Sequence, residues 1–287
     1  MNAVEINNHY ENMVRQEWTN TITVGAWNKW SREQAIHCQP LTDALIRHAE
    51  LEPGQKVLDL ACGVGQPSIS IAQDVLPQGS VVATDLSAGM LEVAKSNAAK
   101  VGVQNIEFKT ADAHDLPFAD NSFDRVVSRL GIMYFWDVEG AIAEIARVLR
   151  PGGVASFVVW GAPENNEYFS TILMPFMKRR EMPMPPADAP TPGRFGDVSA
   201  LAGLFERTGF SKVGTQEYVE PLPWPGTPGD LYRHFYDMAA PLQPYIDSFP
   251  LDVQQQVLRE VEQGFEHVWD GDFTRASASF NAVFVVK

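Results

Sequence analysis

A short glycine-containing stretch carries the clearest chemistry in the sequence. It reads LDLACGVGQPSISIA over residues 58–72 and has the pattern of a buried strand, a turn and a helix. Gly63 and Gly65 allow the backbone to approach a ligand closely, and a helix start favours a negatively charged group. The stretch lacks the third glycine of the dinucleotide fingerprint and the Gly-Lys-Ser/Thr ending of a phosphate loop. A carboxylate is therefore a better guest for this turn than a pyrophosphate.

Three acidic residues lie at the ends of successive apolar runs. Asp59 precedes the glycines and can accept from an ammonium group, so the turn suits an amino acid zwitterion. Asp85 lies twenty residues beyond Gly65, where a carboxylate can accept both hydroxyls of a ribose. Asp112 follows the third run and can accept from the exocyclic amine of adenine. An amino acid, a ribose and an adenine together describe S-adenosylmethionine.

The predicted cofactor site extends to neighbours of these residues. Leu86 and Met90 would form apolar walls against the adenine ring. Arg129 would contact the methionine carboxylate or orient an anionic substrate, unless it only forms a structural salt bridge. The full predicted set is Asp59, Ala61, Gly63, Gly65, Gln66, Asp85, Leu86, Met90, Asp112, Ala113 and Arg129.

The elements that must position these residues follow a regular order. Apolar runs alternate with helical patterns between residues 57 and 160, which predicts a parallel sheet with helices on both faces. We expect strands at 57–61, 80–85, 105–110, 123–129, 154–160, 211–219 and 277–286, and a turn at 150–153. We expect helices at 68–74, 88–100, 138–149 and 197–208. Pro67 fits the first turn of its helix, where its missing N–H has no consequence.

Three parts of the chain are distinguished by these patterns. Residues 1–50 are predicted to form a helical lid, and residues 51–220 together with 270–287 the Rossmann-like, cofactor-binding domain. Residues 221–269 are expected to form a helical insertion that contributes to the substrate pocket. The Pro-rich stretch 182–193 is either a mobile lid or a surface link between helices.

Four motifs occur in order at a specific spacing: VLDLACGVGQ (57–66), VVATDLSAGML (81–91), KTADAHDLPFADNSFDRVVSRLGIMYF (109–135) and RVLRPGGVASFVVWG (147–161). With them the chain resembles the class I S-adenosylmethionine-dependent methyltransferases over about residues 50–220. The most similar group is the small-molecule branch that includes the ubiquinone and menaquinone C-methyltransferases. The resemblance implies a seven-stranded, mostly parallel α/β sheet whose last strand, 277–286, runs antiparallel. Ala61 departs from the family pattern, because it replaces the first of three usual glycines.

The acceptor side is less specified by the sequence. Methyl transfer is an in-line displacement, and a base is needed only if the nucleophile must lose a proton. Of the candidate bases His37, His114 and His234, we favour His234, because tyrosines lie beside it in the insertion. Tyr10 and Tyr134 complete the candidate catalytic set. The predicted substrate pocket contains Trp27, Trp30, Met133, Tyr134, Tyr232 and Tyr236.

Charge and composition narrow the class of partner. The net charge of −14 disfavours nucleic acid, and the chain lacks the Asn/Asp-Pro-Pro-aromatic motif of methyltransferases that act on nucleobase amines. No apolar run is long enough to predict a membrane span, and the N-terminus has no signal-peptide pattern. Cys38 and Cys62 give no disulfide framework and no metal pattern, so we expect a cytoplasmic protein without a metal site.

The expected function is methyl transfer to a carbon, oxygen or nitrogen of a small, partly apolar metabolite. Two alternatives are open at this point. In the first, S-adenosylmethionine is itself the substrate of a cyclase or lyase that releases methylthioadenosine. In the second, the protein senses the cofactor or acts as a scaffold and has no working acceptor pocket. The sequence leaves the oligomeric state open.

Overall fold

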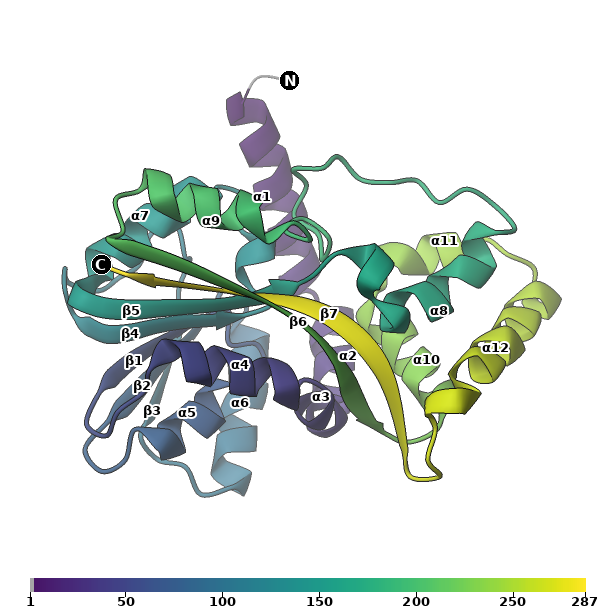
Figure 1. Ribbon diagram of the computed structural model, residues 1–287, viewed down its shortest axis with the longest axis horizontal. Helices are drawn as coiled ribbons and strands as arrows, with labels where there is room; N and C mark the ends of the chain where they lie inside the picture. The colour runs from purple at the N-terminus through teal and green to yellow at the C-terminus, as the bar shows by residue number, and fades with distance from the viewer. Residues whose placement is uncertain (1–2) are drawn as a thin grey trace.

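A single seven-stranded sheet organises the molecule. The computed structural model describes residues 3–287, and its strand order is β3-β2-β1-β4-β5-β7-β6 (Figure 1). The strands are β1 (Lys56–Leu60), β2 (Ser80–Asp85), β3 (Ile106–Thr110), β4 (Phe123–Arg129), β5 (Leu149–Trp160), β6 (Lys212–Pro225) and β7 (Phe273–Val286). Strands β1 to β5 pair in parallel, and β7 runs antiparallel to both β5 and β6. The predicted mostly parallel sheet with an antiparallel last strand is confirmed.

Helices cover both faces of this sheet. Helices α4 (Gln39–Ala49), α5 (Ser68–Asp74) and α6 (Ala88–Lys100) lie on one face, and α7 (Val138–Val148) and α9 (Val198–Arg207) lie on the other (Figure 1). In α7 the buried residues recur every three or four positions, from Val138 through Ala141, Ile142 and Ile145 to Val148. This spacing places them on one side of the helix, which packs against the sheet.

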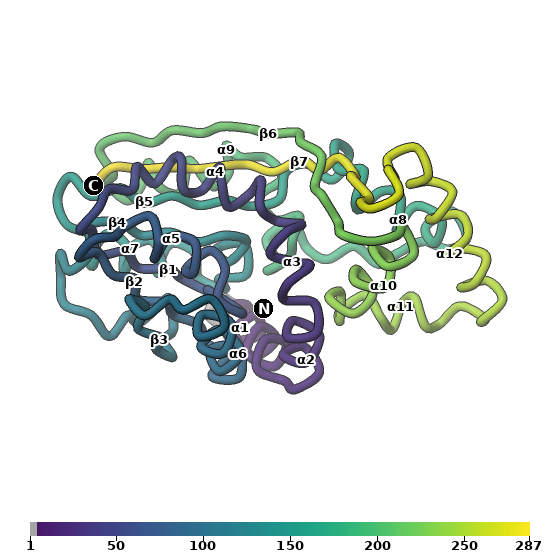
Figure 2. Tube along the Cα trace, turned by 90° about the horizontal axis from the view of Figure 1, so that it is seen from below, coloured from purple at the N-terminus to yellow at the C-terminus, as the bar shows by residue number. Residues whose placement is uncertain are grey.

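A second group of helices lies beyond one end of the sheet. It contains α8 (Glu167–Met177), α10 (Pro228–Met238), α11 (Gln243–Asp247) and α12 (Leu251–Phe265), and α8 packs against α12. Helices α1 (Ala3–Thr19), α2 (Thr21–Lys29) and α3 (Ser31–His37) lie between this group and the sheet (Figure 2). Helix α2 contacts both α6 and α10, so the N-terminal helices bridge the two parts.

Short 3-10 turns complete the chain between the longer elements. They are η1 (Ile132–Tyr134), η2 (Pro163–Asn165), η3 (Ala240–Leu242) and η4 (Glu266–Val268). The first of them follows β4 directly, which places the predicted pocket residues Met133 and Tyr134 at the carboxyl end of that strand. Within residues 3–287, no helix has the length and apolar character that a membrane crossing requires.

The two strands that flank the insertion are longer than predicted. We expected the sixth strand to end at residue 219, but β6 continues through Pro221 and Pro223 to Pro225. Strand β6 is the edge of the sheet, where proline is tolerated at alternate positions whose missing N–H faces away from the partner. Leu222 and Trp224, between the prolines, are fully buried. The insertion therefore begins after Pro225 and ends before Phe273.

The predicted turn at residues 150–153 is an irregularity inside β5. This strand begins at Leu149, and its pairing with β4 shifts register between Phe123 and Arg125. Gly152 has a φ of +73°, a left-handed conformation that glycine adopts without steric penalty. The local kink is the feature that the Arg-Pro-Gly-Gly pattern predicted as a turn.

Candidate functional site

The glycine turn links β1 to α5 at the carboxyl end of the central strands. Gly63 and Gly65 have φ values of +54° and +109°, both in the left-handed region. A Cβ on Gly65 would lie 3.1 Å from the side chain of Ile69 and 3.3 Å from Ala94, whereas a Cβ on Gly63 would meet nothing within 4 Å. Gly65 thus permits close packing of two helices, and Gly63 lines open space at the turn, where a ligand can approach the backbone.

Asp59 is the most unusual acid of this site. It is fully buried, and its Oδ2 accepts a hydrogen bond from the Ser68 hydroxyl at 2.5 Å. Its Oδ1 is buried without a hydrogen-bond partner. Burial raises the pKa of the Asp59 carboxyl to about 7, against the lowering effect of Ser68. An ammonium group placed beside Oδ1 would supply the missing donor and favour the ionised carboxylate.

The start of α5 does not offer the anion site that we expected. Pro67 is the residue before the helix rather than its first residue, and the helix has seven residues. The backbone N–H of Ser68 donates to Asp59, and that of Ile69 donates to the carbonyl of Gly65 at 2.9 Å. Because these donors already have partners inside the protein, a carboxylate at the turn needs a different partner.

Arg129 is placed to be that partner. Its guanidinium donates to the Thr42 hydroxyl at 2.8 Å and to the Gln66 carbonyl at 3.1 Å. It lowers the pKa of Asp59 electrostatically, although less than burial raises it. Within residues 6–287 Arg129 has no ion pair with an acidic side chain, which disfavours the alternative of a structural salt bridge. An uncompensated cation beside the turn suits a ligand carboxylate.

Asp85 ends β2 and is held by backbone donors. Its Oδ2 accepts from the N–H of Gly63 at 2.9 Å, and its Oδ1 accepts from the N–H of Ser87 at 2.8 Å. Burial raises the pKa of the Asp85 carboxyl, and these backbone donors oppose that shift. Each carboxylate oxygen can still accept one further hydrogen bond. The backbone bonds therefore fix the side chain in place while it remains able to accept from a pair of hydroxyls.

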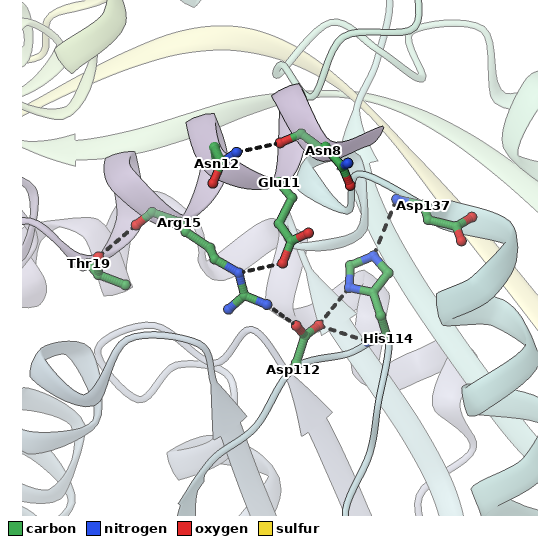
Figure 3. A network of polar contacts seen from close by, with 8 residues as sticks. All are labelled: Asn8, Glu11, Asn12, Arg15, Thr19, Asp112, His114 and Asp137. Atoms are coloured by element: carbon green, nitrogen blue, oxygen red, sulfur yellow. Dashed lines mark hydrogen bonds and ion pairs between the residues drawn. The ribbon is translucent and has the colours of Figure 1, made fainter. Parts of the chain in front are cut away.

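Asp112 is engaged by its near neighbour His114 and by Arg15 of the N-terminal helix (Figure 3). Its Oδ1 accepts from His114 Nδ1 at 2.6 Å, and its Oδ2 accepts from the Arg15 guanidinium at 2.5 Å. Burial alone would raise the pKa of Asp112, but the hydrogen bonds from His114 and the charge of Arg15 lower it to about 2. Arg15 belongs to α1 and also bonds Glu11 at 2.8 Å. Asp112, the predicted partner of the adenine amine, is therefore already ion-paired with Arg15 of the N-terminal helix α1.

His114 is committed on both ring nitrogens. Its Nδ1 donates to Asp112, and its Nε2 accepts from the backbone N–H of Asp137 at 3.3 Å. Its ring stacks on Trp136 with centroids 3.9 Å apart, and the Arg15 guanidinium lies 4.9 Å from the same Trp136 ring. Both ring nitrogens of His114 therefore have partners inside the protein, which disfavours it as the base.

The remaining predicted cofactor residues surround these acids. Leu86 and Ala113 are half-buried next to Asp85 and Asp112, and Met90 on α6 is 1% exposed. The Gln66 side chain accepts from the Ser70 hydroxyl at 2.9 Å, so only its backbone faces Arg129. Ala61 has a φ of +56°, the left-handed conformation that the family's usual glycine would adopt with less strain.

An aromatic cluster lies where η1 meets α1 and α2. The ring of Tyr134 meets Trp18 edge-on at 4.9 Å, and Trp18 lies 5.7 Å from Trp27. The indole nitrogens of Trp18 and Trp27 are buried without a partner. Burial raises the pKa of the neighbouring Glu17 carboxyl to about 7, and burial together with Glu17 raises the pKa of Tyr134. Met133, by contrast, is buried in the main core.

The other predicted catalytic and pocket residues fall into separate places. Tyr10 donates from its hydroxyl to Asp188 at 3.3 Å, which joins α1 to the Pro-rich stretch. Trp30 donates from Nε1 to Asp237 of α10 at 2.7 Å. Tyr236 donates to Asp247 at 2.8 Å. Tyr232 lies one turn before Tyr236, on the side of α10 opposite His234, so the structure does not bring these tyrosines and that histidine together.

His234 lies inside a buried aromatic group. It is 2% exposed, and its ring centroid lies 4.4 Å from Trp224 and 5.8 Å from Trp30. His37, another of the candidate bases, is 1% exposed with its ring centroid 6.0 Å from that of His234. Neither histidine has a hydrogen-bond partner on either ring nitrogen.

Several residues of this region were missed from the sequence. Ser68, Arg15 and Trp224 contact Asp59, Asp112 and His234 respectively, yet none was predicted. Arg15 had a weak signal, because it lies four residues after Glu11 on a helical pattern. Ser68 and Trp224 had none. The described part of the chain contains no group of three or more His, Cys, Asp or Glu residues arranged to hold a metal ion.

Comparison of the sequence and the structure with known proteins identifies the family of this chain. Residues 57–153 match the family model described as a methyltransferase domain. An uncharacterized protein of Mycobacterium tuberculosis is 33% identical over 165 residues, which are 58% of this chain and 57% of that protein. The chain thus spans little more than half the length of that relative.

Two further comparisons cover more of the chain. Demethylmenaquinone methyltransferase of Listeria welshimeri is 31% identical over 198 residues, which are 64% of this chain and 78% of that protein. The crystal structure of the YcgJ protein from Bacillus subtilis matches with a TM-score of 0.55 and 21% identity, covering 87% of this chain and 98% of that one. The second likeness supports the fold alone.

Proposed function

Because this chain belongs to the class I S-adenosylmethionine-dependent methyltransferases, we propose that it transfers a methyl group to a small, partly apolar metabolite. The acceptor atom is a carbon, oxygen or nitrogen. The observation that carries the proposal is the buried, unpartnered Oδ1 of Asp59 beside the open left-handed turn at Gly63. A buried acceptor without a donor is rare in folded proteins, and a ligand ammonium group supplies the donor.

The residues present fit the cofactor from end to end. Asp59 would accept from its ammonium group, Arg129 would bind its carboxylate, and Asp85 would accept from the ribose hydroxyls. Leu86, Met90 and Ala113 would contact the adenine ring, with Asp112 accepting from its amine once Arg15 yields. When bound, the cofactor supplies a methyl group on a positively charged sulfur.

The aromatic rings around η1 support the sulfonium end of the proposed site. Tyr134, Trp18 and Trp27 present aromatic rings near the end of β4, and aromatic faces interact favourably with a sulfonium. The N-terminal helices, which bridge the sheet and the second helical group, would exclude water from the reacting atoms. Tyr10, Trp30, Met133, Tyr232, Tyr236 and His234 belong to this proposal as pocket or catalytic candidates.

The class of acceptor is part of the same proposal. The net charge of −14 supports a small molecule over a nucleic acid, because a protein that binds phosphates non-specifically needs a basic surface. The lack of a disulfide between the two buried cysteines, Cys38 and Cys62, supports a cytoplasmic location.

Calorimetric titration with S-adenosylhomocysteine tests the cofactor site. We expect the wild-type protein to bind it and Asp59→Asn to bind it roughly 10- to 100-fold more weakly, since a hydrogen bond to a charged group contributes roughly 1.5–3 kcal/mol. Asp120→Asn is the matched control, because the Asp120 side chain is 71% exposed and lies on the surface. Absence of binding at millimolar ligand would contradict the proposal.

Chromatography of the spent cofactor tests the reaction itself. Incubation of the enzyme with S-adenosylmethionine and small aromatic hydroxyl, amine and enol compounds should release S-adenosylhomocysteine. Release of methylthioadenosine without any acceptor would instead identify a cyclase or lyase. Binding without either product under all conditions would identify a sensing or scaffolding protein.

A further inference from the structure

The buried histidine pair is the most unusual polar feature outside the cofactor site. His37 of α3 and His234 of α10 are separated by 197 positions, yet their rings meet edge-on at 6.0 Å. Trp224, near the end of β6, contacts both rings, at 5.8 Å from His37 and 4.4 Å from His234. Three elements distant in the sequence thus place polar rings together in one buried cluster.

The cluster contains six polar atoms without a hydrogen-bond partner. They are Nδ1 and Nε2 of His37, Nδ1 and Nε2 of His234, Nε1 of Trp224 and Oε1 of Gln34, which lies one helical turn before His37. Burial lowers the pKa of His37 to about 3 and that of His234 well below its usual range, so both rings are neutral near pH 7. Buried polar atoms are almost always paired in folded proteins, so six in one cluster indicate a binding site.

The balance of donors and acceptors specifies the ligand. A neutral imidazole has one N–H donor and one acceptor nitrogen, and the indole adds a donor while the amide oxygen adds an acceptor. The cluster therefore offers three donors and three acceptors. A carboxylate or phosphate would leave the acceptors unpaired, and an ammonium group would leave the donors unpaired. A neutral hydroxyl donates one hydrogen bond and accepts two, so it can pair with both kinds of atom in this set.

The aromatic rings around the cluster indicate which kind of apolar group carries the hydroxyl of the ligand. Trp30 meets His234 edge-on at 5.8 Å, and Tyr168 lies 5.1 Å from His37. With Trp224, these side chains form apolar, flat surfaces that favour an aromatic ring. A phenol-type compound combines such a ring with a hydroxyl.

The cluster also adjoins the cofactor site through Arg129. The same guanidinium lowers the pKa of Asp59 and that of His37, in each case less than burial changes it. Arg129 donates to Thr42, and the Thr42 hydroxyl donates at 3.2 Å to the carbonyl of Cys38, the residue after His37. One arginine therefore separates the proposed cofactor tail from the histidine pair.

We propose that His37 and His234 bind the hydroxyl of a phenol-type acceptor and that His234 takes its proton during methyl transfer. This inference rests on the proposed methyltransferase function. The hydroxyl oxygen forms a bond to the methyl carbon as the methyl–sulfur bond breaks, and the electron pair of that bond stays on sulfur. The hydroxyl proton moves to the free nitrogen of His234, which balances the charge lost by the sulfonium.

Other ionisable groups near the pair do not replace it as the proton acceptor. Arg129 is a permanent cation, Cys38 is a fully buried thiol whose pKa burial raises, and Tyr168 is a phenol whose pKa burial also raises. Asp237 is occupied by Lys29 and Trp30, both at 2.7 Å. The two neutral imidazoles are the groups left in the cluster that have an unpaired nitrogen to accept the proton.

Probe binding tests the recognition step without turnover. We would titrate 4-propylphenol and 4-propylanisole into the wild-type protein saturated with S-adenosylhomocysteine, following tryptophan fluorescence and the ¹⁵N shifts of the histidine rings. We expect the phenol to bind about tenfold more tightly, because the ether lacks the donor that an imidazole nitrogen needs, and to move the signals of His37 and His234. Equal affinities, including no binding of either probe, would overturn the proposal.

Variants separate recognition from proton transfer. His234→Phe should erase the preference for the phenol, whereas His234→Gln, which keeps a donor and an acceptor, should retain much of it. Methyl transfer to 4-propylphenol by His234→Gln should fall about 100-fold or more, as expected for loss of a general base. The control is His267→Gln, because the side chain of His267 is 65% exposed.

The affinity for S-adenosylhomocysteine distinguishes failure of the methyltransferase proposal from failure of the role assigned to the histidine pair. Each variant should bind S-adenosylhomocysteine within about twofold of the wild-type protein, which also reports that it is folded. Failure of the wild-type protein to bind it would overturn the methyltransferase proposal. Normal binding together with full turnover in His234→Gln would overturn only the role of the histidine pair.

Discussion

The cofactor side and the acceptor side of this protein satisfy their buried polar groups in opposite ways. On the proposed cofactor side, Asp85 and Asp112 each accept two or more hydrogen bonds from fixed donors of the protein, although Oδ1 of Asp59 has no partner. On the acceptor side, the ring nitrogens of His37, His234 and Trp224 have no partner. Fixed donors hold the acids in position before a ligand arrives, whereas the unpaired rings depend on a ligand to complete them.

The difference follows from where the residues lie along the chain. Asp59, Asp85 and Asp112 end three strands that neighbour one another in the sheet, so one turn and its adjacent backbone can hold two of them. The acceptor-side rings come from α3, the end of β6 and α10, which meet only through tertiary packing. The proposed cofactor site is thus built on neighbouring strand ends, whereas the proposed acceptor site is built from elements that are distant in the sequence.

Replacement of Asp85 should have the largest effect on the cofactor side. Asp85→Ala removes the acceptor of two ribose hydroxyls and the tether of the Gly63 and Ser87 N–H groups. We expect the affinity for S-adenosylhomocysteine to fall by about 100-fold or more, since each such bond contributes roughly 1.5–3 kcal/mol. Calorimetry measures the loss, with exposed Asp252→Ala as the control. An affinity within threefold of wild type would contradict the assignment of Asp85 to the ribose. It would also remove the contrast drawn between the two sides of the site.

The pH dependence of binding should report the unpaired oxygen of Asp59. Its folded-state pKa of about 7, raised by burial, means that the carboxyl loses its charge as pH falls through that value. An ammonium group binds the ionised form, whose fraction falls from about one half at pH 7 to about 3% at pH 5.5, so the affinity should fall about 15-fold over this range. Asp59→Asn should show a flat, weaker profile. A flat profile in the wild-type protein would contradict the assignment.

The same shift predicts the stability of the ligand-free protein. The unfolded carboxyl ionises near pH 4, while the folded one keeps its proton up to about pH 7. Stability is therefore highest below pH 4 for this group, falls as pH rises through this window, and levels off above it. Urea unfolding of wild type and Asp59→Asn at pH 5 and pH 8 measures the difference, which should favour the variant more at pH 8.

Arg15 links the two sides, and its replacement should have a smaller effect. Arg15→Gln removes the ion pair to Asp112 and loosens α1 from the carboxyl end of β3. The Arg15 side chain is 41% exposed, so the pair contributes roughly 0.2–1 kcal/mol, and we expect cofactor association to accelerate up to about fivefold. Stopped-flow fluorescence measures this rate, because Trp136 lies against Arg15. Arg259→Gln, at an exposed position, serves as the control. An unchanged or slower rate in Arg15→Gln would contradict the idea that the Arg15–Asp112 ion pair slows cofactor association.

The comparison also explains what the sequence could and could not predict. The strands, the glycine turn and the acids that follow it are local patterns, and each is present where the sequence placed it. The long edge strand β6 was shortened in prediction, because its alternate prolines are permitted only by an edge position that the sequence does not reveal. Arg15 was missed because its partner Asp112 lies 97 residues away.

The side-chain partners on the proposed acceptor side could not be predicted either, because they also lie far apart in the sequence. His234 was chosen for its neighbours Tyr232 and Tyr236, but a helix turns those tyrosines away from it. Its actual neighbours, Trp224 and His37, come from other elements. Sequence proximity thus predicted which strand ends carry the acids, but it did not predict the surroundings of His234.

The smallest effect is expected at the one position where the cofactor side departs from its family. Ala61 holds a left-handed φ of +56°, which disfavours an L-residue by roughly 1–2 kcal/mol. Ala61→Gly removes this strain but adds conformational freedom to the unfolded chain. That added freedom cancels roughly 0.5–1 kcal/mol of the stability gained. We expect a net stabilisation of about 1 kcal/mol or less in urea unfolding, with an unchanged affinity for S-adenosylhomocysteine.

Gly131 is the matched partner for this test. A Cβ on Gly131 would lie 2.7 Å from the Cβ of Ala61 and 2.5 Å from the hydroxyl of Ser128, so Gly131→Ala should destabilise the protein by about 1–3 kcal/mol. Adding Ala61→Gly should recover only part of that loss, because the contact with Ser128 remains. A double-mutant cycle measures the coupling. If Ala61→Gly proved destabilising on its own, packing of the alanine methyl group would outweigh its backbone strain, and the departure from glycine would be a stabilising feature of this turn.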